Sequence, residues 1–116
     1  ASSAAELRDP SNGSSFTNNG NGAVDLGSSE VQGAEYYHAR GFAHRKRNDY
    51  HAAIKDYTHA IQLDPKHFKA LFNRGFSHDK IGAYDRAIED YTQALKVEPH
   101  NGYAFYNRGI TYDRKG

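Results

Sequence analysis

The sequence repeats itself with a period of 34 residues from Ala34 onward. Residues 34–67 align with residues 68–101, and residues 102–116 align with the beginning of both. Among the recurring positions, Arg40-Gly41 becomes Arg74-Gly75 and then Arg108-Gly109. Self-similarity at a fixed period is typical of repeat architectures, in which each unit buries its apolar face against its neighbours.

Each repeat has the pattern of two helices joined by a tight turn. Apolar and small residues recur every three or four positions, the pattern breaks at Asn48-Asp49 in the first repeat and at Gly82 in the second, and Pro65 prevents continuation of the second helix. Asp49 is a plausible N-cap. The pattern predicts no strand, and helices over residues 35–47, 50–63, 68–81, 84–97 and 102–114.

Small and aromatic residues alternate at positions where antiparallel helices meet. Gly41 and Gly75 lack bulk where two helices must approach closely, and Tyr57 and Tyr91 are predicted to fill the layered interior beside them. A stripe of Tyr at helical spacing is typical of a core rather than of a cofactor site.

These residues resemble the tetratricopeptide repeat. The family pattern is matched in the first repeat by Tyr37, Gly41, Tyr50, Ala53, Tyr57, Ala60 and Pro65, and in the second by Leu71, Gly75, Tyr84, Ala87, Tyr91, Ala94 and Pro99. The resemblance implies an all-α, right-handed superhelix (an α-solenoid) of antiparallel helix pairs. It also implies a concave groove, lined by the first helix of each pair, that binds peptides or partner domains.

Residues 1–33 differ in composition from the rest of the chain. They are rich in Ser, Asn and Gly, and their few apolar residues follow neither helical nor strand spacing. A flexible leader or linker is expected there. The predicted organisation is thus a leader at 1–33, repeats at 34–67 and 68–101, and the first helix of a third repeat at 102–116. Because the sequence begins without Met and ends inside a repeat, we expect a piece of a longer protein.

Arg precedes the repeat Gly at a position where the family often has an aliphatic residue. Arg40 and Arg74 would lie on a packed face and would need a partner there. Asp56 and Asp90 recur at the same period. We therefore expect structural ion pairs, Arg40 with Asp56, and Arg74 with either Asp56 or Asp90.

The composition argues against an enzyme. No two of the seven His residues are spaced as a metal-binding pair on one helix, and no Cys is present, so neither a metal nor another cofactor is expected. Ser77 and His78 are adjacent, and adjacent helical residues point apart. The absence of Cys also fits a reducing, cytoplasmic location. No apolar run is long enough to cross a membrane.

The first helices carry the predicted binding site, because one set of positions on them points away from the Gly and Tyr positions. Aromatics there would be costly to leave in water, Asn73 and Asn107 could bind a peptide backbone, and three basic residues along one edge would favour acidic side chains. The candidate groove residues are His38, Phe42, Lys46, Lys69, Phe72, Asn73, Phe76, Lys80, Tyr103, Tyr106, Asn107, Ile110 and Arg114.

The leading interpretation is a scaffold that binds an extended apolar and acidic segment of a protein or peptide partner. One alternative is a chaperone adaptor, but of the five positions that form the carboxylate clamp in the family, here His38, Phe42, Asn73, Tyr103 and Asn107, only Asn73 fits. RNA binding by a helical solenoid is disfavoured, since the net charge is only +1 and acidic residues interrupt the basic surface. Self-association through an uncovered C-terminal helix is also expected.

Overall fold

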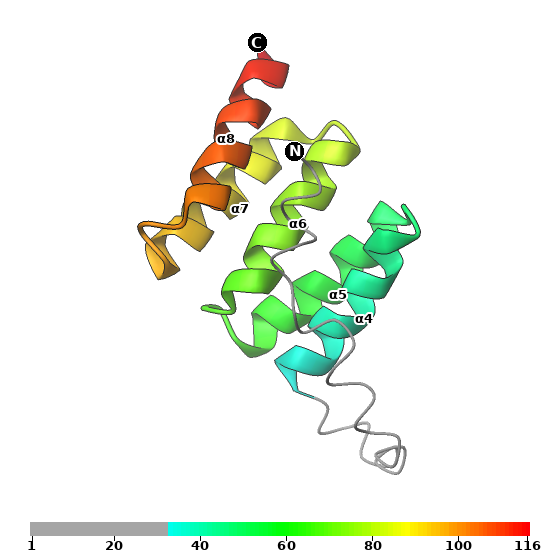
Figure 1. Cartoon of the computed structure of the whole chain (residues 1–116). Helices are drawn as coiled ribbons and strands as arrows, with labels where there is room; N and C mark the ends of the chain where they lie inside the picture. The colour runs from blue at the N-terminus through cyan, green and yellow to red at the C-terminus, as the bar shows by residue number, and fades with distance from the viewer. Residues whose placement is uncertain (1–32) are drawn as a thin grey trace.

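A computed structural model describes residues 33–116, and the predicted leader before Gly33 lies outside the described residues. The described part contains five helices and no strand (Figure 1). The helices are α4 (Ala34–Lys46), α5 (Tyr50–Leu63), α6 (Phe68–Lys80), α7 (Tyr84–Val97) and α8 (Gly102–Lys115). The predicted all-α helical array is confirmed.

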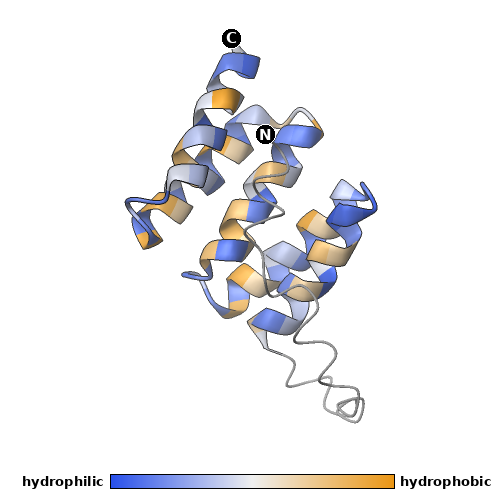
Figure 2. Cartoon of the chain, in the orientation of Figure 1, coloured by the Kyte–Doolittle hydropathy of each residue, from blue (hydrophilic) through white to orange (hydrophobic). Residues whose placement is uncertain are grey.

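Each helix packs against the next one in the sequence. The main contacts join α4 to α5, α5 to α6, α6 to α7 and α7 to α8, and smaller contacts join the first helices α4, α6 and α8. Figure 1 shows the helices packed one after another in the order of the sequence. Hydrophobic and hydrophilic bands alternate along the helices in Figure 2, as expected when each helix buries only part of its surface.

Local signals in the sequence set where the helices begin and turn. Asp49 caps α5 by accepting a hydrogen bond from the Ala52 amide at 3.4 Å, as predicted. His67 and Asn101 cap α6 and α8 in the same way, which the sequence analysis did not identify. The turn inside each complete repeat passes through a left-handed residue, Asn48 at φ 64° and Gly82 at φ 82°.

The repeat glycines permit the close approach of the two helices in a pair. A Cβ atom on Gly41 would lie 2.9 Å from the ring of Tyr57, and one on Gly75 would lie 3.1 Å from the ring of Tyr91. Both tyrosines are buried, together with the small residues around them. The predicted pairing of small and aromatic residues therefore forms the interior of both complete repeats.

None of the helices in residues 33–116 is long and apolar enough to cross a membrane.

Candidate peptide-binding face

The predicted groove residues all lie on α4, α6 and α8, the first helices of their repeats. We call the surface that these residues define the first-helix face. They fall into two groups by exposure. His38, Phe42, Phe72, Asn73, Phe76 and Asn107 are buried, and Lys69 and Ile110 are partly buried. Lys46, Lys80, Tyr103, Tyr106 and Arg114 are exposed. Only the second group offers side chains openly to a partner.

Phe42, Phe72 and Phe76 do not form an exposed aromatic surface, so the prediction that they line an open groove is wrong. Phe42 is 2% exposed and Phe76 is 5% exposed. Phe72 belongs to a core cluster with Ala87, and its ring centroid lies 5.6 Å from that of Tyr91. These positions lie where neighbouring helices meet, so they stabilise the array first of all.

Arg45 links α4 to α6, a contact that was not predicted from the sequence. Its guanidinium carbon lies 4.7 Å from the ring centroid of Phe42 on α4 and 4.8 Å from that of Phe76 on α6. A guanidinium at this distance is attracted to the faces of aromatic rings. The signal was present in the sequence as Arg45 three residues after Phe42, but the contact with Phe76 requires the fold.

A second link between the first helices involves Glu35, His38 and His67. The Nε2 atom of His67 lies 3.1 Å from a carboxylate oxygen of Glu35, and the Nδ1 atom of His38 lies 3.5 Å from the other oxygen. Asn73 on α6 approaches His38 Nε2 at 3.4 Å. Partial burial alone would raise the pKa of Glu35, but the hydrogen bonds from the two histidines outweigh it and hold this pKa well below its usual range.

Three donor atoms of this cluster lie within 4.8 Å of one another, a spacing that one metal ion could bridge. This cluster was not predicted from the sequence, because His67 lies far from Glu35 and His38 along the chain. The hydrogen bonds nevertheless favour a link without metal. His67 Nδ1 accepts from the Ala70 amide at 3.1 Å, so its proton is on Nε2 and points to Glu35. A metal on Nε2 would need the opposite tautomer and would cost the cap of α6.

The exposed edge of the first-helix face carries one basic residue per repeat. Lys46 and Lys80 extend over the rings of Phe42 and Phe76, with their Nζ atoms 5.5 and 5.3 Å from the ring centroids. Arg114 forms an ion pair with Asp79 of α6. The two lysines therefore leave their charges accessible, whereas part of the charge of Arg114 is compensated.

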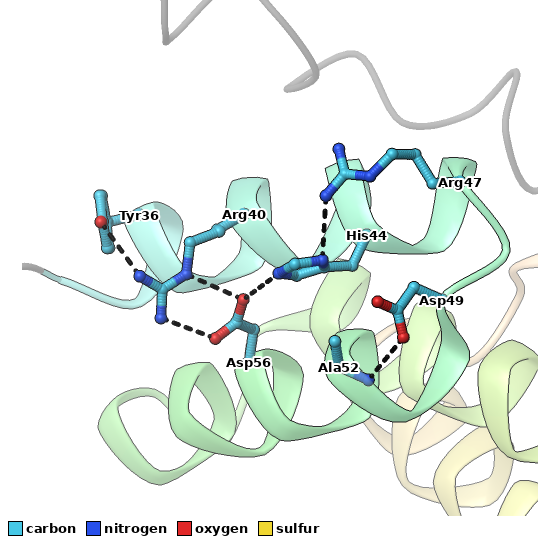
Figure 3. A network of polar contacts seen from close by, with 7 residues as sticks. All are labelled: Tyr36, Arg40, His44, Arg47, Asp49, Ala52 and Asp56. Atoms are coloured by element: carbon cyan, nitrogen blue, oxygen red, sulfur yellow. Dashed lines mark hydrogen bonds and ion pairs between the residues drawn. The ribbon is translucent and has the colours of Figure 1, made fainter.

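The arginines of the two complete repeats form ion pairs inside their own repeats. Arg40 donates to both carboxylate oxygens of Asp56, at 2.9 and 3.0 Å, and His44 lies on the other side of that carboxylate (Figure 3). Arg74 donates in the same bidentate geometry to Asp90 at 2.8 Å, which decides between its two expected partners. Each pair fixes a first helix to its second helix.

Two tetratricopeptide-repeat models match the sequence, one over residues 34–67 and the other over residues 68–101. Together they cover more than half of the 116 residues. The chain belongs to the tetratricopeptide-repeat family. Comparison with curated protein sequences gives no significant match.

Several solved tetratricopeptide-repeat structures are similar. The crystal structure of MamA protein has a TM-score of 0.71 and 31% identity over 72% of this chain and 46% of that one. The Arabidopsis OM64 TPR domain has a TM-score of 0.69 and 29% identity, over 71% of this chain and 68% of that one. The second TPR domain of human RPAP3, solved by NMR with the HSP70 peptide SGPTIEEVD, has a TM-score of 0.67 and 31% identity, over 69% and 67%.

The structure also has a cavity lined by residues of α5, α6 and α7. It measures about 330 Å³ and is lined by Ile54, Thr58, Arg74, His78, Arg86, Glu89, Asp90 and Gln93. None of the groove residues predicted from the sequence lines this cavity. Two arginines face two acids there, so the lining favours neither charge sign.

Proposed function

We propose that this tetratricopeptide-repeat chain is an interaction scaffold that binds an extended, acidic segment of another protein along the exposed edge of the first-helix face. The observation that carries the proposal is the row of basic side chains, one per repeat, formed by Lys46, Lys80 and Arg114. Such a row at the rim of a site attracts acidic side chains and sets their register.

The apolar part of the contact is expected near the C-terminal end of this face. Tyr103 and Tyr106 on α8 are exposed, and tyrosine is enriched at protein interfaces because its ring combines apolar area with a polar tip. A segment with acidic residues toward α4 and α6 and apolar residues toward α8 would match this arrangement. Affinity on the order of micromolar is expected for so open a site.

The similar RPAP3 domain provides a probe of suitable chemistry, because its peptide SGPTIEEVD carries three acidic residues. A labelled copy of this peptide should be titrated against the chain and followed by fluorescence anisotropy. Charge reversal at both Lys46→Glu and Lys80→Glu should weaken binding about tenfold, ~1.4 kcal/mol. The matched control is Lys55→Glu with Lys96→Glu, which makes the same change at exposed positions of the second helices.

Equal weakening by both double variants would contradict the proposal, because it would show attraction by overall charge rather than by this edge. Absence of binding at low salt would contradict it as well. The carboxylate-clamp alternative is tested by the same peptide with a C-terminal amide: a clamp loses its ligand group, whereas the lysine row still meets the acidic side chains. Truncating Asn73 or Phe76 is unsuitable here, since both are buried and their loss would destabilise the fold.

A further inference from the structure

We propose that Lys46 and Lys80 bind two acidic residues that stand three positions apart in a partner segment of polyproline II conformation. The inference rests on the proposed function, because it concerns the same exposed edge of the first-helix face. It adds the conformation of the segment and the spacing of its acidic residues. Both follow from how the two lysines are held on α4 and α6.

Each of these lysines lies over an aromatic ring of its own helix. Lys46 follows Phe42 by four residues and Lys80 follows Phe76 by four, so each side chain extends back over a ring one helical turn earlier. The Nζ atoms lie 5.5 and 5.3 Å from the two ring centroids. Because the two lysines are held in the same way, the separation of their ammonium groups follows the separation of the two rings.

Arg45 fixes the separation of the two rings. Its guanidinium carbon lies 4.7 Å from the centroid of Phe42 and 4.8 Å from that of Phe76. The two centroids therefore lie within about 10 Å of one another, which is the usual spacing of neighbouring helices. All three side chains are buried, so this spacing belongs to the packed interior. We infer that the two ammonium groups are also about 10 Å apart.

A spacing of about 10 Å distinguishes between the extended conformations of a bound segment. Polyproline II has three residues per turn and rises ~3.1 Å per residue, so residues i and i+3 lie on one side, ~9 Å apart. In a β-strand, residues on one side are two positions apart, ~7 Å, or four positions apart, ~13 Å. Two carboxylates on one side of a polyproline II segment therefore match the two lysines better than those of a strand.

Arg114, the third basic residue of the edge, is not equivalent to the two lysines. It forms an ion pair with Asp79 of α6, and the same carboxylate accepts a hydrogen bond from Thr111. A third acidic residue of the segment would have to compete with this buried carboxylate for Arg114. The segment therefore gains affinity from two acidic residues, and a third one adds little.

The probes are three labelled proline-rich peptides that differ only in the spacing of two glutamates, because proline stabilises polyproline II before binding. The glutamates stand two, three or four positions apart, and the composition and net charge are identical. Fluorescence anisotropy should show at least about fivefold tighter binding for the spacing of three, or ~1 kcal/mol. A third glutamate, three positions further on, should improve the affinity by less than about twofold, or ~0.4 kcal/mol.

Charge reversal tests whether the preference comes from the two lysines. Lys80→Glu should remove the preference for a spacing of three, because one lysine alone has no spacing to match. Lys96→Glu is the matched control at an exposed position of α7 and should keep the preference.

Equal binding of the three proline-rich peptides would overturn the inference. If Lys46→Glu with Lys80→Glu still weakens them, the proposed function stands without the spacing. Tighter binding of a helical, alanine-rich peptide with glutamates seven positions apart, ~10 Å along a helix, would replace polyproline II by a helix. If SGPTIEEVD binds and no proline-rich peptide does, only the inference fails. If none of these peptides binds at low salt, both the inference and the proposed function fail.

Discussion

The two complete repeats contain the same Arg, Asp and His at the same spacing, yet the surroundings of these residues differ. The Arg40 side chain is 50% exposed, whereas that of Arg74 is 21% exposed. Arg40 uses its remaining donor on the exposed hydroxyl of Tyr36, and Arg74 uses its own on Thr58 of the preceding repeat. Position in the array therefore changes what an identical pair of residues contributes.

Arg108 occupies the equivalent position in residues 102–116 and extends the comparison. Within residues 33–116, Arg108 has the contact with the preceding repeat, through Thr92, and forms no ion pair with a carboxylate. In the same part of the chain, Arg40 binds the aspartate of its own repeat and donates its other hydrogen bond to Tyr36 of its own helix. Only Arg74 combines both contacts, so the second repeat is expected to be the most stable part of residues 33–116.

The largest predicted effect is the difference between two truncations. Arg74→Ala leaves the buried carboxylate of Asp90 without its bidentate partner and should cost about 2–4 kcal/mol of unfolding free energy. Arg40→Ala should cost less, about 1–2 kcal/mol, because water already reaches that pair. Urea unfolding of both variants measures the difference. Equal losses would show that burial does not distinguish the repeats.

The repeat glycines should respond with opposite signs. In Gly75→Ala the new Cβ would lie 3.2 Å from the backbone oxygen of Ala87, which cannot easily move, so a net loss of about 1–2 kcal/mol is expected. In Gly109→Ala nothing is met within 4 Å, and alanine is a better helix former by about 1 kcal/mol. Thermal unfolding should show a lower Tm for the first variant and a higher Tm for the second. A loss at Gly109 would mean that its surface is covered.

The period of the sequence was sufficient to predict the helices, because each complete repeat has a break between its two helices and a proline after the second one. All five predicted ranges agree with the observed bounds within one residue. The arginine positions were also informative, since an arginine on a packed face needs an acceptor and the aspartates recur at the same period. These features depend on one repeat at a time.

Contacts between repeats were not predictable in the same way. Arg45 lies between the rings of Phe42 and Phe76, and His67 meets Glu35 across 32 positions of sequence. Neither contact follows from helical spacing, because each depends on how one helix pair is placed on the next. The same limitation explains why Phe42 and Phe76 were expected to be exposed. A helical projection gives the direction of a side chain but not the neighbour that covers it.

The helix caps provide a smaller test of the comparison. Asp49 caps α5, whereas the equivalent position of α7 is Ala83, which makes no side-chain cap. The backbone angles agree, with φ −95° and ψ 75° at Asp49 and φ −88° and ψ 69° at Ala83. Asp49→Ala should therefore lose about 0.5–1 kcal/mol and Ala83→Asp should gain a similar amount. Chemical denaturation checks both. If Ala83→Asp is neutral, the cap geometry differs between the repeats.

The smallest predicted effect concerns the two histidines beside the aspartates. In the first repeat the Nδ1 atom of His44 lies 3.1 Å from Arg47, but Ile81 replaces this arginine in the second repeat. Among residues 33–116, Nδ1 of His78 has no hydrogen-bond partner. Burial lowers the pKa of His78, and it outweighs the opposing effect of Asp90, while Arg74 and Arg86 lower the pKa further.

Because the pKa of His78 is lower in the folded state, acid favours the unfolded state, which binds the proton more readily. The stability that neutral His78 provides is complete above the unfolded pKa of about 6.5 and declines as the pH falls below it. Between pH 7 and pH 6 the loss from this one group is at most about 0.7 kcal/mol.

The measurement is the difference in unfolding free energy between the protein and His78→Gln at several pH values, with the exposed His51→Gln as control. Taking differences removes the pH-dependent contributions that the two proteins share. A curve for His78→Gln that stays parallel to that of the unmodified protein would show that the second repeat tolerates a charged histidine, and that the burial distinguishing it from the first repeat has no electrostatic consequence.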